Sequence, residues 1–194
     1  MRPVDWDEAH RTRSRPLLGY TTADDYHALF NQVGSFTPQV QRAQQVLEVG
    51  PGLGSFLASL QPEQRLALEV SEVNKAKLRT AGVRIWGDSP VPEYADVAVC
   101  LSVLQHCDED QARVIFAKVA AALRCCWSWG PFYVNAVEEK DGLKLAPGEI
   151  SRGWSILELR RLAAWSRLEL AEHKTLPVPN QPLFHHLMRF EVMR

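Results

Sequence analysis

The chain has 194 residues, of which 46% are hydrophobic and 23% are charged. This length favours a single domain, and the composition excludes a disordered, collagen-like or coiled-coil chain. Lys and Arg number 22 against 23 Asp and Glu, so the chain lacks the positive excess that is typical of nucleic-acid-binding proteins.

No apolar run is long enough to span a membrane, and residues 1–15 lack the apolar segment of a secretory signal. The four cysteines form no C-x-x-C pair, which argues against a zinc or thioredoxin-like site. We therefore expect free thiols, no bound metal and a cytoplasmic protein.

Residues 1–40 contain few continuous apolar runs. Within them, residues 21–32 (TTADDYHALFNQ) predict a short helix with a threonine cap and an acidic first turn. We expect a helical cap at residues 1–40, lying over the carboxyl ends of the strands of a main domain at residues 41–194. The side chains expected to face inward from this cap are Tyr20, Tyr26 and Phe30.

From residue 45 on, short apolar segments alternate with segments of helical spacing. The expected strands are 46–49, 66–70, 83–86, 96–101, 131–137, 168–176 and 183–192. Strands that are almost continuously apolar and alternate with helices predict an α/β fold with a doubly wound, mostly parallel seven-stranded sheet. A short Pro-rich turn joins the last two strands, so the last strand is expected to be antiparallel.

The loop after the first expected strand reads EVGPGLGS. In a doubly wound sheet the ligand lies beyond the carboxyl ends of the strands, and glycines let the backbone approach it closely. Gly50, Gly52 and Gly54 form G-x-G-x-G, one residue shorter than the dinucleotide fingerprint. Glu48 is expected to point into this loop, where it would repel a pyrophosphate and tolerate a cation. Taken alone, the loop also fits a plain strand–helix turn.

Acidic residues end the next two expected strands. Glu69 lies about 20 positions beyond the glycine loop, where an acidic side chain commonly accepts both ribose hydroxyls. Gly87, Asp88 and Ser89 follow the third strand, where they offer groups that can read an adenine amine. Each acid alone fits a solvated loop end, but three consecutive strands with such ends favour a nucleoside-binding edge.

The motifs VLEVGPGLGS, LEVS, GD and DVAVCLSVLQHCDED follow one another in this order. Residues 40–194, which carry them, resemble the class I S-adenosylmethionine-dependent methyltransferases of the small-molecule type. The resemblance implies S-adenosylmethionine as the cofactor. The implied cofactor-binding residues are Glu48, Gly50, Gly52, Gly54, Glu69, Val70, Asp88, Ser89, Ser102 and Gln105.

The resemblance also implies individual roles. The three glycines would lie under the methionine portion of the cofactor, and Glu69 would hold the ribose hydroxyls. Asp88 and Ser89 would flank the adenine, while Ser102 and Gln105 would lie beside the sulfonium.

His106, just past the fourth expected strand, is the candidate general base, because an imidazole titrates near neutral pH. The alternative is that it packs locally. His185 and His186 are adjacent on the last strand and face opposite sides, so we expect one near the acceptor site and the other in packing. Trp154 is a further candidate for the acceptor pocket.

The expected function is methyl transfer to a small-molecule acceptor by direct in-line displacement, which positioning alone can promote. The alternatives are a non-catalytic S-adenosylmethionine-binding module and a protein or peptide methyltransferase. A nicotinamide-dependent oxidoreductase is disfavoured by the short glycine spacing and by Glu48. The sequence predicts neither a nucleic-acid nor a membrane partner, and it leaves the acceptor and the oligomeric state open.

Overall fold

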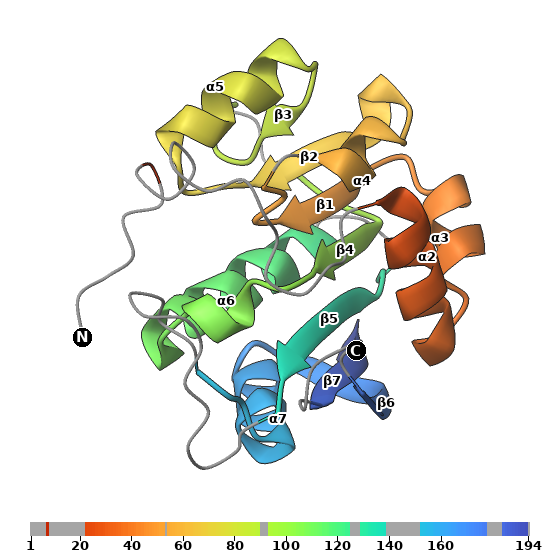
Figure 1. Ribbon diagram of the computed structural model, residues 1–194, viewed down its shortest axis with the longest axis vertical. Coiled ribbons are helices and arrows are strands. Elements are labelled where there is room, and N and C mark those ends of the chain that lie inside the picture. The colour runs from red at the N-terminus through yellow and green to blue at the C-terminus, as the bar shows by residue number, and fades with distance from the viewer. Residues whose placement is uncertain are drawn as a thin grey trace.

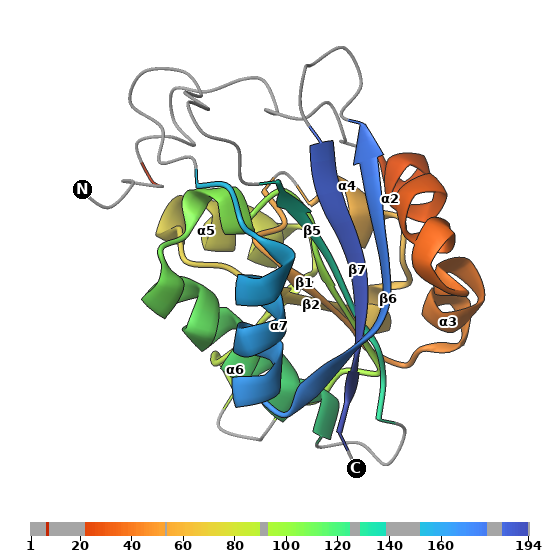
Figure 2. The ribbon, with the colours of Figure 1, turned by 90° about the horizontal axis from the view of Figure 1, so that it is seen from below.

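The computed structural model describes residues 7, 22–52, 54–89, 93–124, 129–138, 152–177 and 184–193. In this part of the chain, seven strands form one sheet with helices on both faces (Figures 1 and 2). The strands are β1 (Val46–Val49), β2 (Arg65–Leu68), β3 (Arg84–Ile85), β4 (Val97–Cys100), β5 (Phe132–Val137), β6 (Leu168–Pro177) and β7 (Phe184–Val192). The α-helices are α2 (Ala23–Phe30), α3 (Phe36–Arg42), α4 (Ser55–Ala58), α5 (Glu72–Thr80), α6 (Glu109–Arg124) and α7 (Ile156–Trp165).

The strand order is β3-β2-β1-β4-β5-β7-β6. The neighbours from β3 to β5 are parallel, whereas β7 runs antiparallel to both β5 and β6. The predicted doubly wound, mostly parallel sheet with an antiparallel last strand is therefore confirmed. The third strand is shorter than predicted, because Gly87 adopts a positive φ of 93° and turns the chain directly after Trp86.

One face of the sheet packs against α6 and α7. Phe116 of α6 contacts Phe132 of β5 and Phe190 of β7 edge-to-face, with ring centroids 5.3 and 5.6 Å apart. In α6 the buried side chains recur every three or four residues, as the sequence pattern predicts.

The opposite face packs against α2, α3, α4 and α5. Phe30 of α2 and Phe36 of α3 both contact the Tyr133 ring of β5, with ring centroids 5.5 and 4.9 Å away. The expected position of the N-terminal helices over the carboxyl ends of the strands is therefore wrong for α2 and α3. Their apolar side chains need an apolar surface, and the face of the sheet supplies it.

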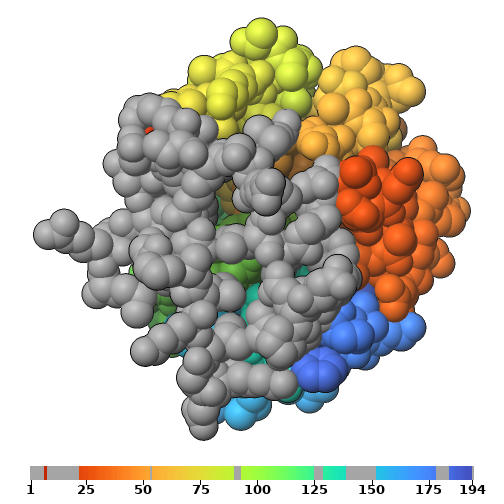
Figure 3. Space-filling view, viewed as in Figure 1, coloured from red at the N-terminus to blue at the C-terminus, as the bar shows by residue number. Residues whose placement is uncertain are grey.

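The N-terminal helices meet the C-terminal strands on this face. The 3-10 helix after α2 (Asn31–Val33) contacts both β6 and β7, and the atoms of α2 and of the C-terminal strands adjoin in Figure 3. The predicted threonine cap is confirmed, because the side chain of Thr22 accepts a hydrogen bond from the backbone of Asp25. Tyr20, the third expected inward residue, lies outside the described residues. None of the helices in the described ranges is long and apolar enough to cross a membrane.

Candidate active site

The glycine loop brings the end of β1 against the segment that follows β4. Gly50, Gly52 and Gly54 all have positive φ, at 59°, 56° and 72°. A Cβ atom on Gly50 would lie 2.7 Å from Cγ2 of Val103, which is closer than real Cβ atoms approach. Position 50 therefore requires glycine, both for its backbone conformation and for this close approach.

Glu48 ends β1 as a buried carboxylate with 1% of its surface exposed. Its Oε1 accepts a 2.5 Å hydrogen bond from the Tyr26 hydroxyl of α2. Its Oε2 is buried and has no hydrogen-bond partner in the described part of the chain. Burial raises the pKa of Glu48 to about 7, and the nearby charge of Glu69 acts in the same direction. The Tyr26 hydroxyl and the backbone of Leu57 oppose this rise.

Glu69 directly follows β2, and its side chain folds back toward the backbone of the next two residues. Its Oε1 accepts hydrogen bonds from the backbone N–H groups of Val70 and Ser71, at 2.7 and 2.9 Å. Its Oε2 lies 3.4 Å from Nδ2 of Asn74. Because two carboxylate oxygens together accept about four hydrogen bonds, Oε2 retains capacity for another donor. The side chain of Val70 is exposed.

Asp7 reaches the start of α5, beside Glu69. Its Oδ1 accepts hydrogen bonds from the Ser71 hydroxyl at 2.6 Å and from the Val73 backbone at 3.3 Å. A carboxylate at a helix N-terminus stabilises the first turn. No pattern in the sequence relates Asp7 to this turn, so the contact was not predicted.

The segment after β4 holds the polar residues expected beside the sulfonium. Ser102 has a positive φ of 57°, which is uncommon outside glycine and marks a constrained backbone. The Ser102 hydroxyl and both polar side-chain atoms of Gln105 are buried and have no hydrogen-bond partner in the described part of the chain. Unsatisfied buried groups are rare in folded proteins, so these side chains are candidates for contact with a ligand.

His106 ends the 3-10 helix Leu104–His106 and is 8% exposed. Nε1 of Trp154 donates a 2.7 Å hydrogen bond to the backbone carbonyl of Leu104 and thereby holds this short helix. Trp154 itself is fully buried in the core under α6 and α7. The expectation that it lines the acceptor pocket is therefore wrong, because its indole packs in the core.

Asn135 on β5, which the sequence analysis did not consider, contacts His185 on β7, one of the two adjacent histidines that it did consider. Asn135 interrupts the apolar run of β5, and its Nδ2 lies 2.9 Å from Nδ1 of His185. Both side chains are fully buried, and burial lowers the pKa of His185 to about 4. The sequence could have indicated this contact, because Asn135 is the one amide side chain in the otherwise apolar or aromatic strand FYVNAV. His186 faces the other way, and its Nδ1 lies 2.9 Å from Nε2 of His173.

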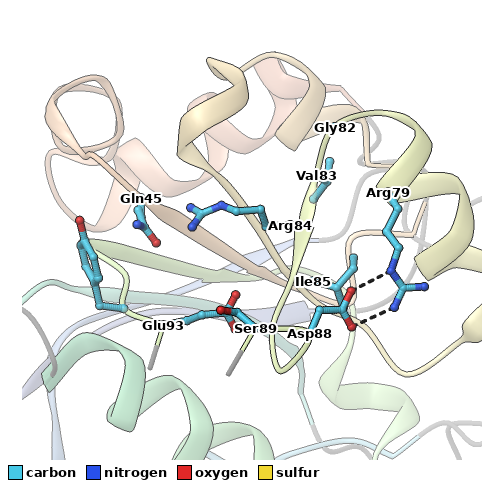
Figure 4. A pocket seen from close by; sticks show the side chains of 10 residues that line it. Gln45, Arg79, Gly82, Val83, Arg84, Ile85, Asp88, Ser89 and Glu93 are labelled. Carbon is cyan, nitrogen blue, oxygen red and sulfur yellow. Dashed lines mark hydrogen bonds and ion pairs between the residues drawn. The ribbon is translucent and has the colours of Figure 1, made fainter. Parts of the chain in front are cut away.

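Asp88 and Ser89 follow β3 at the edge of the sheet. They line a groove of about 590 Å³ along the β3 edge of the sheet, whose lining includes no described residue of the glycine loop (Figure 4). The Asp88 carboxylate binds the Arg79 guanidinium through two hydrogen bonds of 2.7 and 2.9 Å. This hydrogen-bonded guanidinium lowers the pKa of Asp88.

The structure thus forms two groups from the predicted site residues. Val49 pairs with Leu68 and with Cys100, so the residues that follow β1, β2 and β4 lie level at one edge. That edge holds Gly50, Glu69 and Ser102, whereas Asp88 and Ser89 belong to the β3 groove. Within the described ranges no three His, Cys, Asp or Glu side chains cluster as metal ligands would.

No protein-family model and no curated protein sequence matches this chain. Solved structures do match its fold. Magnesium protoporphyrin IX methyltransferase from Synechocystis PCC 6803, solved with bound S-adenosylhomocysteine, has a TM-score of 0.59 at 12% identity, over 96% of this chain and 92% of that one. The 1,6-didemethyltoxoflavin-N1-methyltransferase of Burkholderia thailandensis gives 0.58 at 16% identity, over 94% of both chains.

A third structure, an S-adenosylmethionine-dependent methyltransferase from Clostridium acetobutylicum, has a TM-score of 0.57 at 11% identity, over 89% of this chain and 98% of that one. This chain therefore has the fold of the class I S-adenosylmethionine-dependent methyltransferases. The fold that the sequence motifs implied is confirmed.

Proposed function

We propose that this chain binds S-adenosylmethionine at the carboxyl edge of β1, β2 and β4 and transfers its methyl group to a small-molecule acceptor. One observation carries the proposal. The glycine loop lies against the segment after β4 at Gly50 and is flanked by two buried acids, Glu48 and Glu69. Such an edge suits a ligand that is a nucleoside at one end and cationic at the other.

The residues present fit this cofactor at three points. A Cβ atom on Gly52 would meet nothing within 4 Å, so this glycine leaves open space for the methionine portion of the cofactor. Oε2 of Glu69 has capacity to accept the ribose hydroxyls. The side-chain atoms of Ser102 and Gln105, which lack partners in the described part of the chain, supply hydrogen bonds beside the reacting end.

The roles of Asp88 and Ser89 at the adenine fit less directly. The Asp88 carboxylate is engaged by Arg79, so reading the adenine amine requires this ion pair to open or to share an oxygen. Both residues are half-exposed surface groups, and an exposed ion pair of this kind contributes little to stability. The ion pair therefore allows adenine binding, but it does not leave the Asp88 carboxylate free to accept a hydrogen bond from the adenine amine.

The bound cofactor supplies a methyl group on a sulfonium, which a nucleophile displaces directly. The protein's contribution is to hold the nucleophile in line and to keep water out. His106 at the end of β4 is the candidate to accept the proton that the acceptor loses. Asn135 and His185 offer uncharged hydrogen-bonding groups at the neighbouring strand ends for orienting the acceptor.

Two observations support a small-molecule acceptor. Two of the similar folds carry names that state small-molecule substrates, a magnesium porphyrin and a didemethyltoxoflavin. The net charge of −1 also gives no support for a nucleic-acid substrate.

Calorimetry with S-adenosylmethionine, S-adenosylhomocysteine and NAD tests the cofactor. We expect both methyl-cycle ligands to bind and NAD not to bind. NAD binding without a response to either of the other two would overturn the proposal.

Turnover is tested separately, by measuring S-adenosylhomocysteine formation with a panel of small hydroxylated and nitrogen-containing acceptors. We expect at least one member of the panel to be methylated. Cofactor binding without turnover on small molecules, proteins or peptides would favour the non-catalytic binding module.

A further inference from the structure

Tyr26 and Glu48 form a buried pair beside the glycine loop, although 22 positions separate them in the sequence. The Tyr26 hydroxyl donates to Oε1 of Glu48 at 2.5 Å, and both side chains are at least nine-tenths buried. The Tyr26 ring stacks on Phe56 of α4, with ring centroids 4.6 Å apart and an interplanar angle of 7°. The stacking fixes the ring, so the hydroxyl is held on the carboxylate.

Among the described residues, no positively charged group is paired with Glu48. The groups that face it are the Tyr26 hydroxyl from α2, the Leu57 backbone from α4, Glu69 after β2 and the Cys100 thiol of β4. None of these four groups is a cation. An ionised Glu48 is therefore compensated only by hydrogen bonds, and its carboxylate holds a proton up to about neutral pH, with a pKa of about 7.

We propose that the Tyr26–Glu48 pair makes this site selective for the sulfonium-bearing cofactor over its demethylated product, by exchanging the proton on Glu48 for the positive charge of the ligand. The inference rests on the proposed function. S-Adenosylmethionine carries one positive charge more than S-adenosylhomocysteine, and the two are otherwise closely alike. A carboxylate that ionises more readily beside a cation therefore discriminates between them.

The proton and the charges balance at each stage. Binding of the cation favours the ionised carboxylate, and the proton of Glu48 leaves to solvent. In the transfer, the acceptor forms a bond to the methyl carbon, the carbon–sulfur bond breaks, and its electron pair stays on sulfur. The product is then a neutral thioether, Glu48 takes up a proton again, and the attraction that held the cofactor is gone.

Tyr26 sets the pH at which this exchange occurs. Its hydroxyl donates to the ionised form of Glu48, which lowers the pKa of the carboxyl from the value that burial alone would give. Tyr26→Phe removes this hydrogen bond and keeps the ring on Phe56. The variant should therefore move the ionisation of Glu48 to higher pH without removing α2 from its place.

The test compares calorimetric dissociation constants of S-adenosylmethionine and S-adenosylhomocysteine at pH 6, 7 and 8. For a carboxyl whose pKa falls by about two units on binding, the affinity for S-adenosylmethionine should rise about tenfold from pH 6 to pH 8. The affinity for S-adenosylhomocysteine should change less than about threefold. Repeating the titration in two buffers of different ionisation enthalpy should show proton release with S-adenosylmethionine alone.

Three variants complete the test. Glu48→Gln should bind both ligands with no pH dependence and no proton release, and Tyr26→Phe should shift the pH dependence upward. Glu63→Gln, at an exposed position on the 3-10 helix Pro62–Gln64, should behave like the wild type. Melting temperatures show whether each variant is folded, and the wild-type comparison of the two ligands is decisive even where a variant is not.

The failures are distinguishable. If neither ligand binds at any pH, the proposed function is wrong. If both bind the wild type with the same pH dependence, or if S-adenosylmethionine releases no proton, the inference about Tyr26 and Glu48 is wrong and cofactor binding stands.

Discussion

Glu48 and Glu69 are two glutamates at neighbouring strand ends, and their surroundings give them different chemistry. Glu69 accepts hydrogen bonds from two backbone N–H groups of its own turn. Glu48 has one phenol hydroxyl and is enclosed by α2 and α4. Under the proposed function, Glu69 holds the ribose hydroxyls through Oε2, and Glu48 responds to the charge of the ligand.

Replacing Glu69 tests the ribose contact. Glu69→Gln keeps the size of the side chain and one acceptor oxygen, so the turn at Val70 and Ser71 is preserved. It weakens charge-assisted hydrogen bonds, each worth about 1.5–3 kcal/mol. We expect the dissociation constant for S-adenosylhomocysteine to rise at least tenfold, measured by calorimetry. Glu72→Gln, at the exposed start of α5, is the control, and an unchanged constant in Glu69→Gln would show that the ribose is held elsewhere.

Replacing His106 separates its two candidate roles. General-base assistance is worth about 10²–10⁴-fold in turnover. His106 is the buried last residue of a short helix that Trp154 holds, and methyl transfer from a sulfonium can proceed with positioning alone. We therefore expect His106→Ala to lower the melting temperature and leave turnover per folded molecule nearly unchanged, measured on the same preparation. A loss of a hundredfold or more at an unaltered melting temperature would identify His106 as the base.

At the scale of elements, the buried strands were the most predictable part of the chain. β1, β4 and β5 lie close to the predicted residues, because strands covered on both faces must be apolar along their whole length. The glycine loop and Glu69 were predictable for the same local reason, since they directly follow such strands.

Contacts between distant elements were not predictable. Tyr26 reaches Glu48 from α2, and Asp7 reaches α5, because of how the helices pack. No sequence pattern near these residues indicates either contact. Asp88 looked like an adenine ligand from its place after the third strand, but Arg79, one helix earlier, engages its carboxylate.

The pairing of β5 with β7 contains a buried hydrogen bond that should make stability depend on pH. The pKa of His185 falls from its ordinary value of 6.5 to about 4 in the folded chain. Below pH 6.5 the unfolded chain therefore binds the proton more readily, and acid favours unfolding. The contribution of His185 is complete above pH 6.5 and is lost as the pH falls toward 4.

His185→Gln tests this dependence, because glutamine can still bond to Asn135 and does not titrate. Between pH 7 and pH 4.5 we expect the wild type to lose several degrees of melting temperature relative to the variant. Glu48 has the opposite effect: because its pKa is raised, it destabilises the fold as the pH rises from 4.5 toward 7. Both proteins contain Glu48, so the difference between their melting temperatures isolates the contribution of His185. A constant difference across this range would show that His185 does not titrate below its ordinary pKa.

At the scale of the whole molecule, the N-terminal helices and the sheet share one core. Phe30, Phe36 and Phe56 join Tyr133 in a continuous aromatic cluster that spans α2, α3, α4 and β5. The boundary at residue 40, which the composition predicted, thus falls inside α3 and cuts through this cluster. Whether residues 41–194 fold alone therefore depends on how much this aromatic cluster contributes to the free energy of unfolding.

Phe30→Ala and deletion of residues 1–40 answer that question. Phe30 is fully buried, and truncating a buried phenylalanine to alanine costs about 3–5 kcal/mol, so the variant should unfold at a much lower denaturant concentration. The deletion exposes to water the apolar part of the sheet face that α2 and α3 cover, and we expect the product to aggregate or to lose its cooperative transition. Circular dichroism melts and size-exclusion chromatography measure both effects. Leu157→Ala, at a position that is 57% exposed, is the control and should melt like the wild type. A truncated chain that remains monomeric and melts cooperatively would establish residues 41–194 as an independent domain.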